Sequence, residues 1–587
     1  MNPMQRREFL KMAAVGSAGF VVSQNIFAGE LAALADGAKF QIAADAKAAG
    51  KPLVHFWSVC VGAGRANEGL RAGWLEQLKL AHEQCGFQYV RFHGLFHSDM
   101  FVYHRANNQP VFNWQYIDDL FDRMLEIGVR PFVEFGFNPI DPLGGATPSV
   151  ATPVGNVSTN APATFPRGQQ RRGQFWWQGN ATPPSDLNRW AELIEHFARH
   201  CIGRYGIEEV RRWYFEVWNE PNLQPFFRGS TQQQYFALYN ATALAVKKVD
   251  SKLRVGGPAT SNFEVVLPAG KSRATVNREP TSADVEALNW RPVWVEDFLV
   301  YCHSNNLPLD FISTHPYPQD FPLDDLLTGL TVRMKRGIDA TRNDLRLLRK
   351  IVDGSPYPQA EIHLTEWSSS PSSRDFTHDS LQAAAFVVKT NLESAGLVDS
   401  LSYWTFTDVF EEKGAGDTIF HGGFGIVNYQ GIVKPTFHAY RFLNALGDEI
   451  ISSADGVVVT RHRQTNKVTA LAYHYPAEVK ISLPGSSSIA DAEKMLKRGM
   501  PEMFALKLEG LPPRARFLIE TLDKTNGNAI AAWLAMGSPE PPTREQSAEL
   551  RKAALATKRE FVQADESGRL ALRRTIEPWS LVLIAEQ

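Results

Sequence analysis

Two glutamates in this sequence each follow an apolar run that has the composition of a buried strand. Glu220 comes after residues 213–217 in WYFEVWNEPN, and Glu366 comes at the end of the run EIHLTE that begins at residue 361. If both runs are strands of one barrel, their carboxyl ends face each other across a single mouth. Two facing carboxyl groups suit glycoside hydrolysis, because one protonates the leaving oxygen while the other attacks the anomeric carbon or activates water.

The neighbours of Glu220 indicate which carboxyl group could be the acid. Trp218 and Asn219 precede it, and Pro221 follows and restricts the turn. Apolar surroundings disfavour the charged form of a carboxyl group and raise its pKa, which suits a proton donor. We therefore expect Glu220 to be the proton donor of the pair.

A closed sheet is also what the order of elements predicts. From about residue 50, short apolar runs alternate with amphipathic stretches such as 114–128, in which Gly128 lies where a helix C-cap belongs. About eight such units favour an α/β fold of the (β/α)8 TIM barrel type over a doubly wound sheet. The strands are expected at 53–57, 89–92, 130–135, 213–217, 253–256, 310–314, 361–365 and 400–405.

The pattern changes after about residue 450. Alternating apolar and polar runs there predict antiparallel strands at 457–463, 468–475, 478–484 and 569–586, with a charged helix at 543–563. We therefore expect a C-terminal β-sandwich domain over 451–587, beside a catalytic barrel over 36–450. Irregular stretches near 139–180 and 264–290 predict insertions in the barrel, and long loops of this kind are usually functional or disordered.

Composition excludes several classes of function. Lys and Arg total 61 against 63 for Asp and Glu, so nothing in the overall charge suggests nucleic acid or an anionic membrane as a partner. None of the four cysteines lies in a CxxC pair, so neither a zinc site nor a disulfide framework is predicted. These cysteines are Cys60, Cys85, Cys201 and Cys302.

The N-terminal segment has the layout of an export signal. Arg6 and Arg7 are followed by Phe9, Leu10 and Lys11 and then by a modestly apolar stretch. The motif RRxFLK resembles the twin-arginine type of signal. We expect residues 1–35 to be this signal, and the mature protein to be periplasmic or secreted with no membrane span.

Several long motifs give the chain a resemblance to glycoside hydrolase family 39, the β-xylosidase and α-L-iduronidase family of the barrel glycosidase clan. They are YVRFHGLFHSDM (89–100), EIGVRPFVEFGF (126–137), YGIEEVRRWYFEVWNEPN (205–222), EIHLTEWSSS (361–370), YWTFTDVFEE (403–412), FHGGFGIVN (420–428) and KPTFHAYRFLNALG (434–447). The resemblance implies a retaining hydrolase that removes terminal sugars, first of all β-D-xylosyl residues from xylo-oligosaccharides, with no metal or organic cofactor. A retaining pair requires carboxyl groups about 5–5.5 Å apart.

The resemblance also implies roles for single residues. Glu220 in WNEPN matches the general acid/base, Glu366 in LTEW matches the nucleophile, and Asn219 matches the amide that binds the sugar 2-hydroxyl. The other residues that it implies in substrate binding are His93 and His315 lining the glycone subsite, Tyr317 beside the nucleophile, Trp404 as an aromatic floor, and Glu411 and Glu412 on sugar hydroxyls.

The sugar itself stays open, since this chain has HPY at 315–317 and EW at 366–367 where the family's xylosidases tend to have HAY and TEY. An α-L-iduronidase-like enzyme would need a cation for the uronate, for which Arg91 and Arg374 are candidates. A β-glucosidase, an arabinosidase and an exopolysaccharide endoglycosidase are further alternatives. Outside this class, a non-catalytic carbohydrate-binding protein would be expected to have lost one of the two glutamates. The expected partner is an oligosaccharide or polysaccharide, and the oligomeric state is not predicted.

Overall fold

The computed structural model describes residues 38–107, 109–139, 177, 179–266, 289–318, 336–412, 414–480 and 485–587. The expected export signal and most of both expected insertions lie outside these residues, so they stay predictions. Among the described residues, no helix combines the length and the apolar character needed to cross a membrane.

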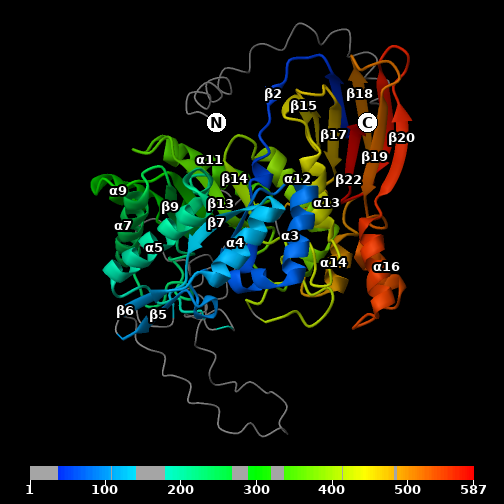
Figure 1. The fold of residues 1–587 in the computed structure, drawn as a ribbon. Helices are drawn as coiled ribbons and strands as arrows, with labels where there is room; N and C mark the ends of the chain where they lie inside the picture. The colour runs from blue at the N-terminus through cyan, green and yellow to red at the C-terminus, as the bar shows by residue number, and fades with distance from the viewer. Residues whose placement is uncertain are drawn as a thin grey trace.

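Eight parallel strands close into a barrel with helices around it, which confirms the predicted (β/α)8 fold (Figure 1). In chain order the strands are β3 (Cys60–Arg65), β4 (Tyr89–His93), β7 (Arg130–Phe135), β8 (Tyr214–Val217), β9 (Arg254–Ser261), β12 (Phe311–His315), β13 (Glu361–Trp367) and β14 (Ser400–Tyr403). The longer helices of this part are α3 (Ala72–Cys85), α4 (Gln115–Ile127), α5 (Leu187–Tyr205), α7 (Gln232–Val249), α9 (Val295–Ser304), α11 (Ala340–Asp353), α12 (Leu381–Glu393) and α13 (Pro435–Asn444).

Helix α4 illustrates how the amphipathic pattern becomes packing. Its buried residues, Ile117, Leu120, Phe121 and Met124, recur at helical spacing and so lie on one face. The helix ends at Gly128, whose φ of 99° is left-handed and whose amide donates to the carbonyl groups of the last turn. The predicted C-cap is therefore confirmed, and it turns the chain into strand β7.

The first barrel strand is not where the apolar run at 53–57 placed it. Residues 56–58 form a 3₁₀ helix, and the strand is the glycine-rich β3, CVGAGR. A Cβ on Gly62 would lie 2.3 Å from Cε3 of Trp404, so the strand needs a glycine where the indole packs against it. A strand built from such small residues lacks the bulky apolar side chains on which the prediction relied.

The C-terminal part is the expected β-sandwich. A three-stranded sheet in the order β1-β18-β21 faces a seven-stranded sheet in the order β2-β15-β16-β17-β22-β19-β20. Apolar side chains of both sheets, among them Phe504 and Ile519, form one core between them. The strands are β1 (Phe40–Asp45), β2 (Lys51–Pro52), β15 (Glu449–Ala454), β16 (Val457–Arg461), β17 (Val468–Tyr473), β18 (Glu502–Glu509), β19 (Arg516–Leu522), β20 (Lys558–Gln563), β21 (Leu570–Ile576) and β22 (Leu581–Glu586).

The sandwich also differs from its prediction in detail. Strands β1 and β2 come from residues placed with the barrel, but they pair with β18 and β15 (Figure 1). The stretch predicted as one helix is α16 (Arg544–Leu555) followed by the strand β20, because its last residues alternate in exposure with a period of two. Residues 478–480 of the predicted strand at 478–484 are not in a strand, and the other four lie outside the described residues.

The apolar core of the barrel extends to the outer face of the seven-stranded sheet, where Leu471 belongs to the same buried cluster, and it is separate from the core inside the sandwich. Leu443 of α13 and Leu550 of α16 belong to the same buried cluster, which also contains the barrel strands. Arg441 of α13 pairs with Glu520 of β19 at 2.9 Å, and His438 contacts the carbonyl oxygen of Ala554 at 2.7 Å. The sandwich thus stabilises the helix that follows the last barrel strand.

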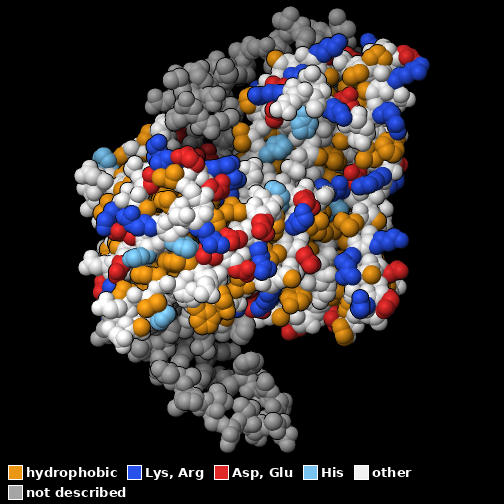
Figure 2. All heavy atoms as spheres, viewed as in Figure 1, with side chains coloured by type: hydrophobic (Ala, Val, Ile, Leu, Met, Phe, Trp, Pro, Cys, Tyr) orange, Lys and Arg blue, Asp and Glu red, His pale blue; other side chains and the backbone are white. Residues whose placement is uncertain are grey.

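Charged side chains are mixed over the face of the molecule seen in Figure 2. Basic and acidic residues alternate across the drawn part of both the barrel and the sandwich. Among the described residues of that face, basic side chains do not form a continuous stripe, which is what a surface that binds a nucleic-acid phosphate backbone would show. This distribution agrees with the near balance of 61 basic and 63 acidic residues.

We expect Gly62→Ala to destabilise the fold by about 1–3 kcal/mol, because the new Cβ displaces the Trp404 indole. The matched control is Gly203→Ala on the exposed side of α5, where a Cβ meets nothing within 4 Å. Removal of a helical glycine should there stabilise the protein by about 0.5–1 kcal/mol. Urea unfolding of both variants measures the difference, and equal stability of the Gly62 variant and the native protein would contradict the close packing.

Candidate active site

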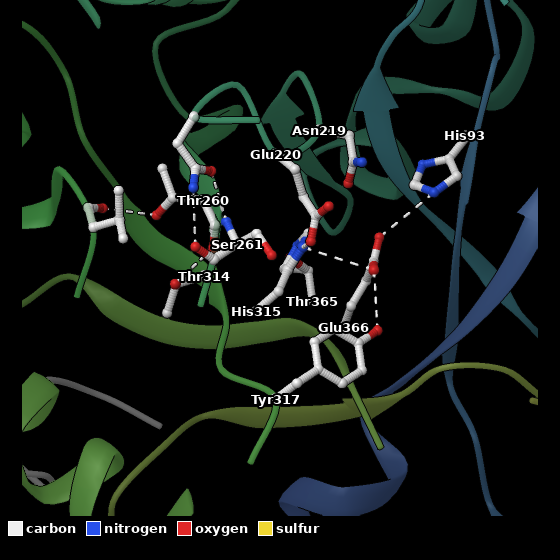
Figure 3. Close-up of polar contacts among 12 residues, drawn as sticks. His93, Asn219, Glu220, Thr260, Ser261, Thr314, His315, Tyr317, Thr365 and Glu366 are labelled. Atoms are coloured by element: carbon white, nitrogen blue, oxygen red, sulfur yellow. Dashed lines mark hydrogen bonds and ion pairs between the residues drawn. The ribbon is translucent and has the colours of Figure 1, made fainter. Parts of the chain in front are cut away.

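The two predicted glutamates are brought together at the carboxyl ends of β8 and β13 (Figure 3). A carboxylate oxygen of Glu220, a carboxylate oxygen of Glu366 and a ring nitrogen of His315 all lie within 4.8 Å of one another. Both glutamates are buried, with exposed fractions of 6% and 5%. This spacing is on the short side of the division between retaining pairs, at about 5–5.5 Å, and inverting pairs, at about 6.5–9.5 Å.

The turn that carries Glu220 has an unusual backbone. Trp218 and Glu220 have φ values of 70° and 42°, in the left-handed region that costs a residue with a side chain about 1 kcal/mol or more. Two hydrogen bonds hold this turn: the indole of Trp218 donates to the carbonyl oxygen of Phe226 at 2.7 Å, and the amide of Glu220 donates to that of Ala259 at 2.9 Å. The turn thereby directs the carboxyl group of Glu220 toward Glu366.

Strand β13 contributes two consecutive side chains to the site. Neighbouring residues of a strand normally point to opposite faces, but the register of β13 with β14 shifts between Leu364 and Trp367. Thr365 contacts Glu216, and Glu366 contacts Arg91, so both side chains reach the charged interior of the barrel. The register shift explains why the side chains of two consecutive residues can both reach the interior of the barrel.

Arg91 of β4 is the cation at the centre of the site. Its Nε donates to Oε2 of Glu216 at 2.6 Å, and its Nη1 donates to Oε1 of Glu366 at 2.6 Å. Its Nη2 donates to Oδ1 of Asn219 at 2.8 Å and lies 3.1 Å from Oε2 of Glu134. Complete burial by itself would lower the pKa of Arg91, but the three carboxylates raise it, so the side chain stays charged.

The two histidines of the site have opposite electrostatic surroundings. Nδ1 of His93 lies 2.6 Å from Oε2 of Glu134, and its Nε2 lies 3.5 Å from Oε1 of Glu366. Burial would lower the pKa of His93, but these two carboxylates raise it above its usual value. Burial lowers the pKa of His315 to about 4, which makes His315 a neutral imidazole near neutral pH.

The pKa values of the glutamates suit a proton donor paired with a nucleophile. Burial raises the pKa of Glu220 to about 7, although a hydrogen bond with Ser261 lowers it in part. Burial also raises the pKa of Glu366, but the charge of Arg91 acts in the opposite direction. The phenol of Tyr317 donates to Oε2 of Glu366 at 3.2 Å (Figure 3). Glu366 therefore has donors that favour its ionised form, whereas Glu220 can keep a proton near neutral pH.

The other predicted sugar-binding residues differ in their positions. Trp404 is 2% exposed and its ring centroid lies 4.8 Å from that of His93, which places it beside the glutamate pair. Burial raises the pKa of Tyr317 most, and the charge of Glu412 adds to this effect, so Glu412 also lies near the site. Glu411 instead forms ion pairs with two arginines, Arg71 at 2.6 Å and Arg65 at 3.3 Å. Its carboxylate is thus held by guanidinium groups.

Both arginines considered for a uronate are engaged with protein groups. Arg91 contacts Glu134, Glu216 and Glu366 inside the barrel, as described above. Arg374 donates to the carbonyl oxygens of residues 373, 414 and 415. The structure therefore does not support these two arginines as the cation that an iduronidase-like site would need.

Sequence reasoning did not identify the inner carboxylates of this site. Glu134 and Glu216 are paired directly in the register of β7 with β8, and Thr365 donates to Glu216. A signal was present, because each glutamate interrupts a run of large apolar residues, FVEF and YFEV. A charge in a strand that is buried on both faces requires a partner, and Arg91 in YVRF is the matching interruption.

Glu220, His315 and Glu366 could also present three ligand atoms to an ion. However, Glu366 already faces the guanidinium of Arg91 at 2.6 Å, and a pKa of about 7 lets Glu220 hold a proton. The electrostatics of the site therefore favour proton transfer between neighbouring groups over the binding of a cation.

Comparisons with known proteins agree with this chemistry. The family described as glycosyl hydrolases family 39 matches residues 40–571. A β-xylosidase of Caldicellulosiruptor saccharolyticus is 36% identical over 503 residues, which are 85% of this chain and 88% of that protein. The crystal structure of the GH39 enzyme from Xanthomonas axonopodis pv. citri has a TM-score of 0.75 at 29% identity and covers 94% of this chain and 97% of its own. A monomeric β-xylosidase from Caulobacter crescentus CB15 has a TM-score of 0.74 at 30% identity, covering 93% of this chain and 99% of its own.

The raised pKa of Glu220 predicts a pH-dependent cost in stability. The native state holds this proton up to about pH 7 and the unfolded chain only up to about pH 4.5, so native stability falls as pH rises between these values. We expect Glu220→Gln to gain up to about 3 kcal/mol relative to the native protein between pH 4.5 and pH 8. Urea unfolding at both pH values measures this gain. A pH-independent difference for Glu220→Gln would contradict the assignment.

Proposed function

The chain belongs to glycosyl hydrolases family 39, and we propose that it removes terminal β-D-xylosyl residues from xylo-oligosaccharides with retention of anomeric configuration. The observation that carries the mechanism is the spacing within 4.8 Å of Glu220 and Glu366, in surroundings that favour a protonated and an ionised carboxyl group. The likeness over most of the chain to the β-xylosidase of C. saccharolyticus supports xylose as the first substrate to test.

The reaction takes two displacements at one carbon. In the first, a carboxylate oxygen of Glu366 bonds to the anomeric carbon, the glycosidic bond breaks, and the proton of Glu220 passes to the leaving oxygen. In the second, Glu220 takes a proton from water, the water oxygen bonds to the anomeric carbon, and Glu366 leaves as a carboxylate. A pKa of about 7 lets Glu220 serve first as acid and then as base near neutral pH.

The remaining groups position the reactants. Arg91 and Tyr317 each donate to a different oxygen of Glu366, which fixes the plane of the nucleophile. Asn219 uses its oxygen to accept from Arg91, so its NH₂ group is the end that can donate to a sugar hydroxyl. His93 and the indole of Trp404 lie on the same side of the pair and would contact the sugar ring.

We expect nitrophenyl β-D-xyloside to be the best substrate in a screen that includes the β-glucoside, the α-L-arabinosides and an α-L-iduronide. NMR of the first product should show the β-anomer of xylose before mutarotation, because two inversions at one carbon give net retention. An α-anomer as the first product would rule out the double displacement. Hydrolysis of the iduronide or of an internal polysaccharide bond alone would favour the alternative specificities.

Two alanine variants separate the roles of the glutamates. Glu220→Ala should lower kcat/KM on xylobiose by about 10²–10⁴-fold but much less on dinitrophenyl xyloside, whose leaving group needs no proton. Glu366→Ala should lower it on both substrates by on the order of 10⁴-fold or more, because the covalent step is lost. The control Glu361→Ala lies at the opposite end of β13 and should change kcat/KM little. Equal losses on both substrates for Glu220→Ala would contradict its role as acid.

A further inference from the structure

We infer that Thr365 is a positioning residue that fixes the tautomer of His315, so that Nδ1 of His315 is unprotonated and accepts a hydrogen bond from a protonated Glu220. The chain Arg91–Glu216–Thr365–His315 thereby holds the acid of the reaction in its proton-bearing form before substrate arrives. This inference rests on the proposed function for its catalytic meaning, although the tautomer can be observed without it.

The donors and acceptors in this chain of hydrogen bonds are set at its charged end, Arg91 and Glu216. Glu216 accepts from Nε of Arg91 through Oε2 at 2.6 Å, and this contact with a guanidinium favours a carboxylate whose two oxygens both accept. Its other oxygen, Oε1, lies 2.7 Å from Oγ1 of Thr365. A threonine hydroxyl has a single proton, so that proton is directed to Glu216.

The direction of the Thr365 hydroxyl in turn decides which nitrogen of His315 carries the proton. Oγ1 of Thr365 lies 2.9 Å from Nε2 of His315, and with its own proton already directed to Glu216 it can only accept in this contact. Nε2 of His315 therefore carries the proton. A neutral imidazole has one N–H group, which leaves Nδ1 as an acceptor.

Nδ1 of His315 faces the carboxyl group of Glu220 at 3.0 Å from Oε1 (Figure 3). Two acceptors at that distance would repel each other, so the contact requires a proton, and the carboxyl group is its source. Burial of His315 agrees with this assignment because it disfavours the doubly protonated ring. Glu366 lies farther from the same nitrogen, at 3.7 Å, and accepts from Arg91 and Tyr317 instead.

Other charged and titratable groups also lie around Glu220 and contribute to its pKa. They are Arg91 and His93 of β4, Glu134 of β7, His315 of β12, Tyr317 in the segment after β12, and Glu366 of β13, while Glu216 of β8 acts on His315. A substitution at Thr365 replaces none of these groups, but Thr365→Val removes the hydrogen bonds of its hydroxyl to Glu216 and to His315.

The first test is the pH dependence of xyloside hydrolysis by Thr365→Val. With no acceptor for Nε2–H, the ring should protonate Nδ1 instead and donate to the carboxylate of Glu220, which lowers the pKa of the acid. The alkaline limb of the kcat/KM profile should move to lower pH by about one unit or more. Thr365→Ser keeps the hydroxyl and should keep the native profile. An unmoved alkaline limb in an active Thr365→Val enzyme would overturn the inference.

The control for structural effects is Thr314→Val on β12, which removes another buried threonine hydroxyl, one that donates to the carbonyl oxygen of Thr260 at 2.8 Å. That variant should change the thermal midpoint without moving the alkaline limb. A similar movement in both threonine variants would show that general loosening, and not the tautomer, shifts the profile.

The second test needs no activity. Long-range ¹H–¹⁵N spectra of the native protein labelled with ¹⁵N-histidine should show an unprotonated Nδ1 and a protonated Nε2 for His315, identified by loss of its signals in His315→Gln. A protonated Nδ1 would overturn the inference. If the protein hydrolyses no glycoside while this tautomer is observed, the proposed function fails and the hydrogen-bond chain stands.

Discussion

The compensation of buried carboxylates by one guanidinium is the constraint on which the site depends. Arg91 is fully buried and faces Glu134, Glu216 and Glu366, which come from three other strands of the barrel. A buried charge without a partner costs several kcal/mol, so neither the cation nor the carboxylates could occupy the barrel interior alone. The register of β4, β7, β8 and β13 must therefore bring these groups together, and the nucleophile is placed by the same requirement.

This arrangement favours different protonation states for two residues of the same type. His93 lies against two carboxylates, which raise its pKa, while His315 lies between a threonine and the acid, and burial lowers its pKa. Glu366 has two donors on its oxygens, while burial is the largest influence on the pKa of Glu220 and raises it. Differences of this kind divide the acid from the nucleophile without any difference in side-chain chemistry.

The sequence predicted the barrel and the glutamate pair well, because both depend on local patterns. Strands and helices follow from periodicity, and Glu220 and Glu366 each end an apolar run. The strand β3 was misplaced because its glycines make room for Trp404, a residue far along the chain. The strand β20 was included in a helix because its pairing with β19 overrides a charged, helix-favouring composition.

The side-chain network was harder to predict from the sequence, because its partners meet only after the barrel has closed. Arg91, Glu134 and Glu216 are visible in the sequence as charges inside apolar runs, but nothing local says which of them pair. Glu411 has the composition expected of a sugar ligand, and only the fold shows that Arg65 and Arg71 hold it. Contacts between distant segments decide these roles, and periodicity carries no information about them.

The pairing of β1 with β18 has a consequence for biosynthesis. Phe40 lies opposite Phe504, and β18 in turn pairs with β21, which begins at Leu570. The smaller sheet therefore cannot be completed until β21 (Leu570–Ile576) has left the ribosome, whereas all eight barrel strands emerge earlier. During synthesis the apolar side chains of β1, such as Phe40 and Ile42, therefore stay exposed to chaperones until the later strands of the sandwich have been made.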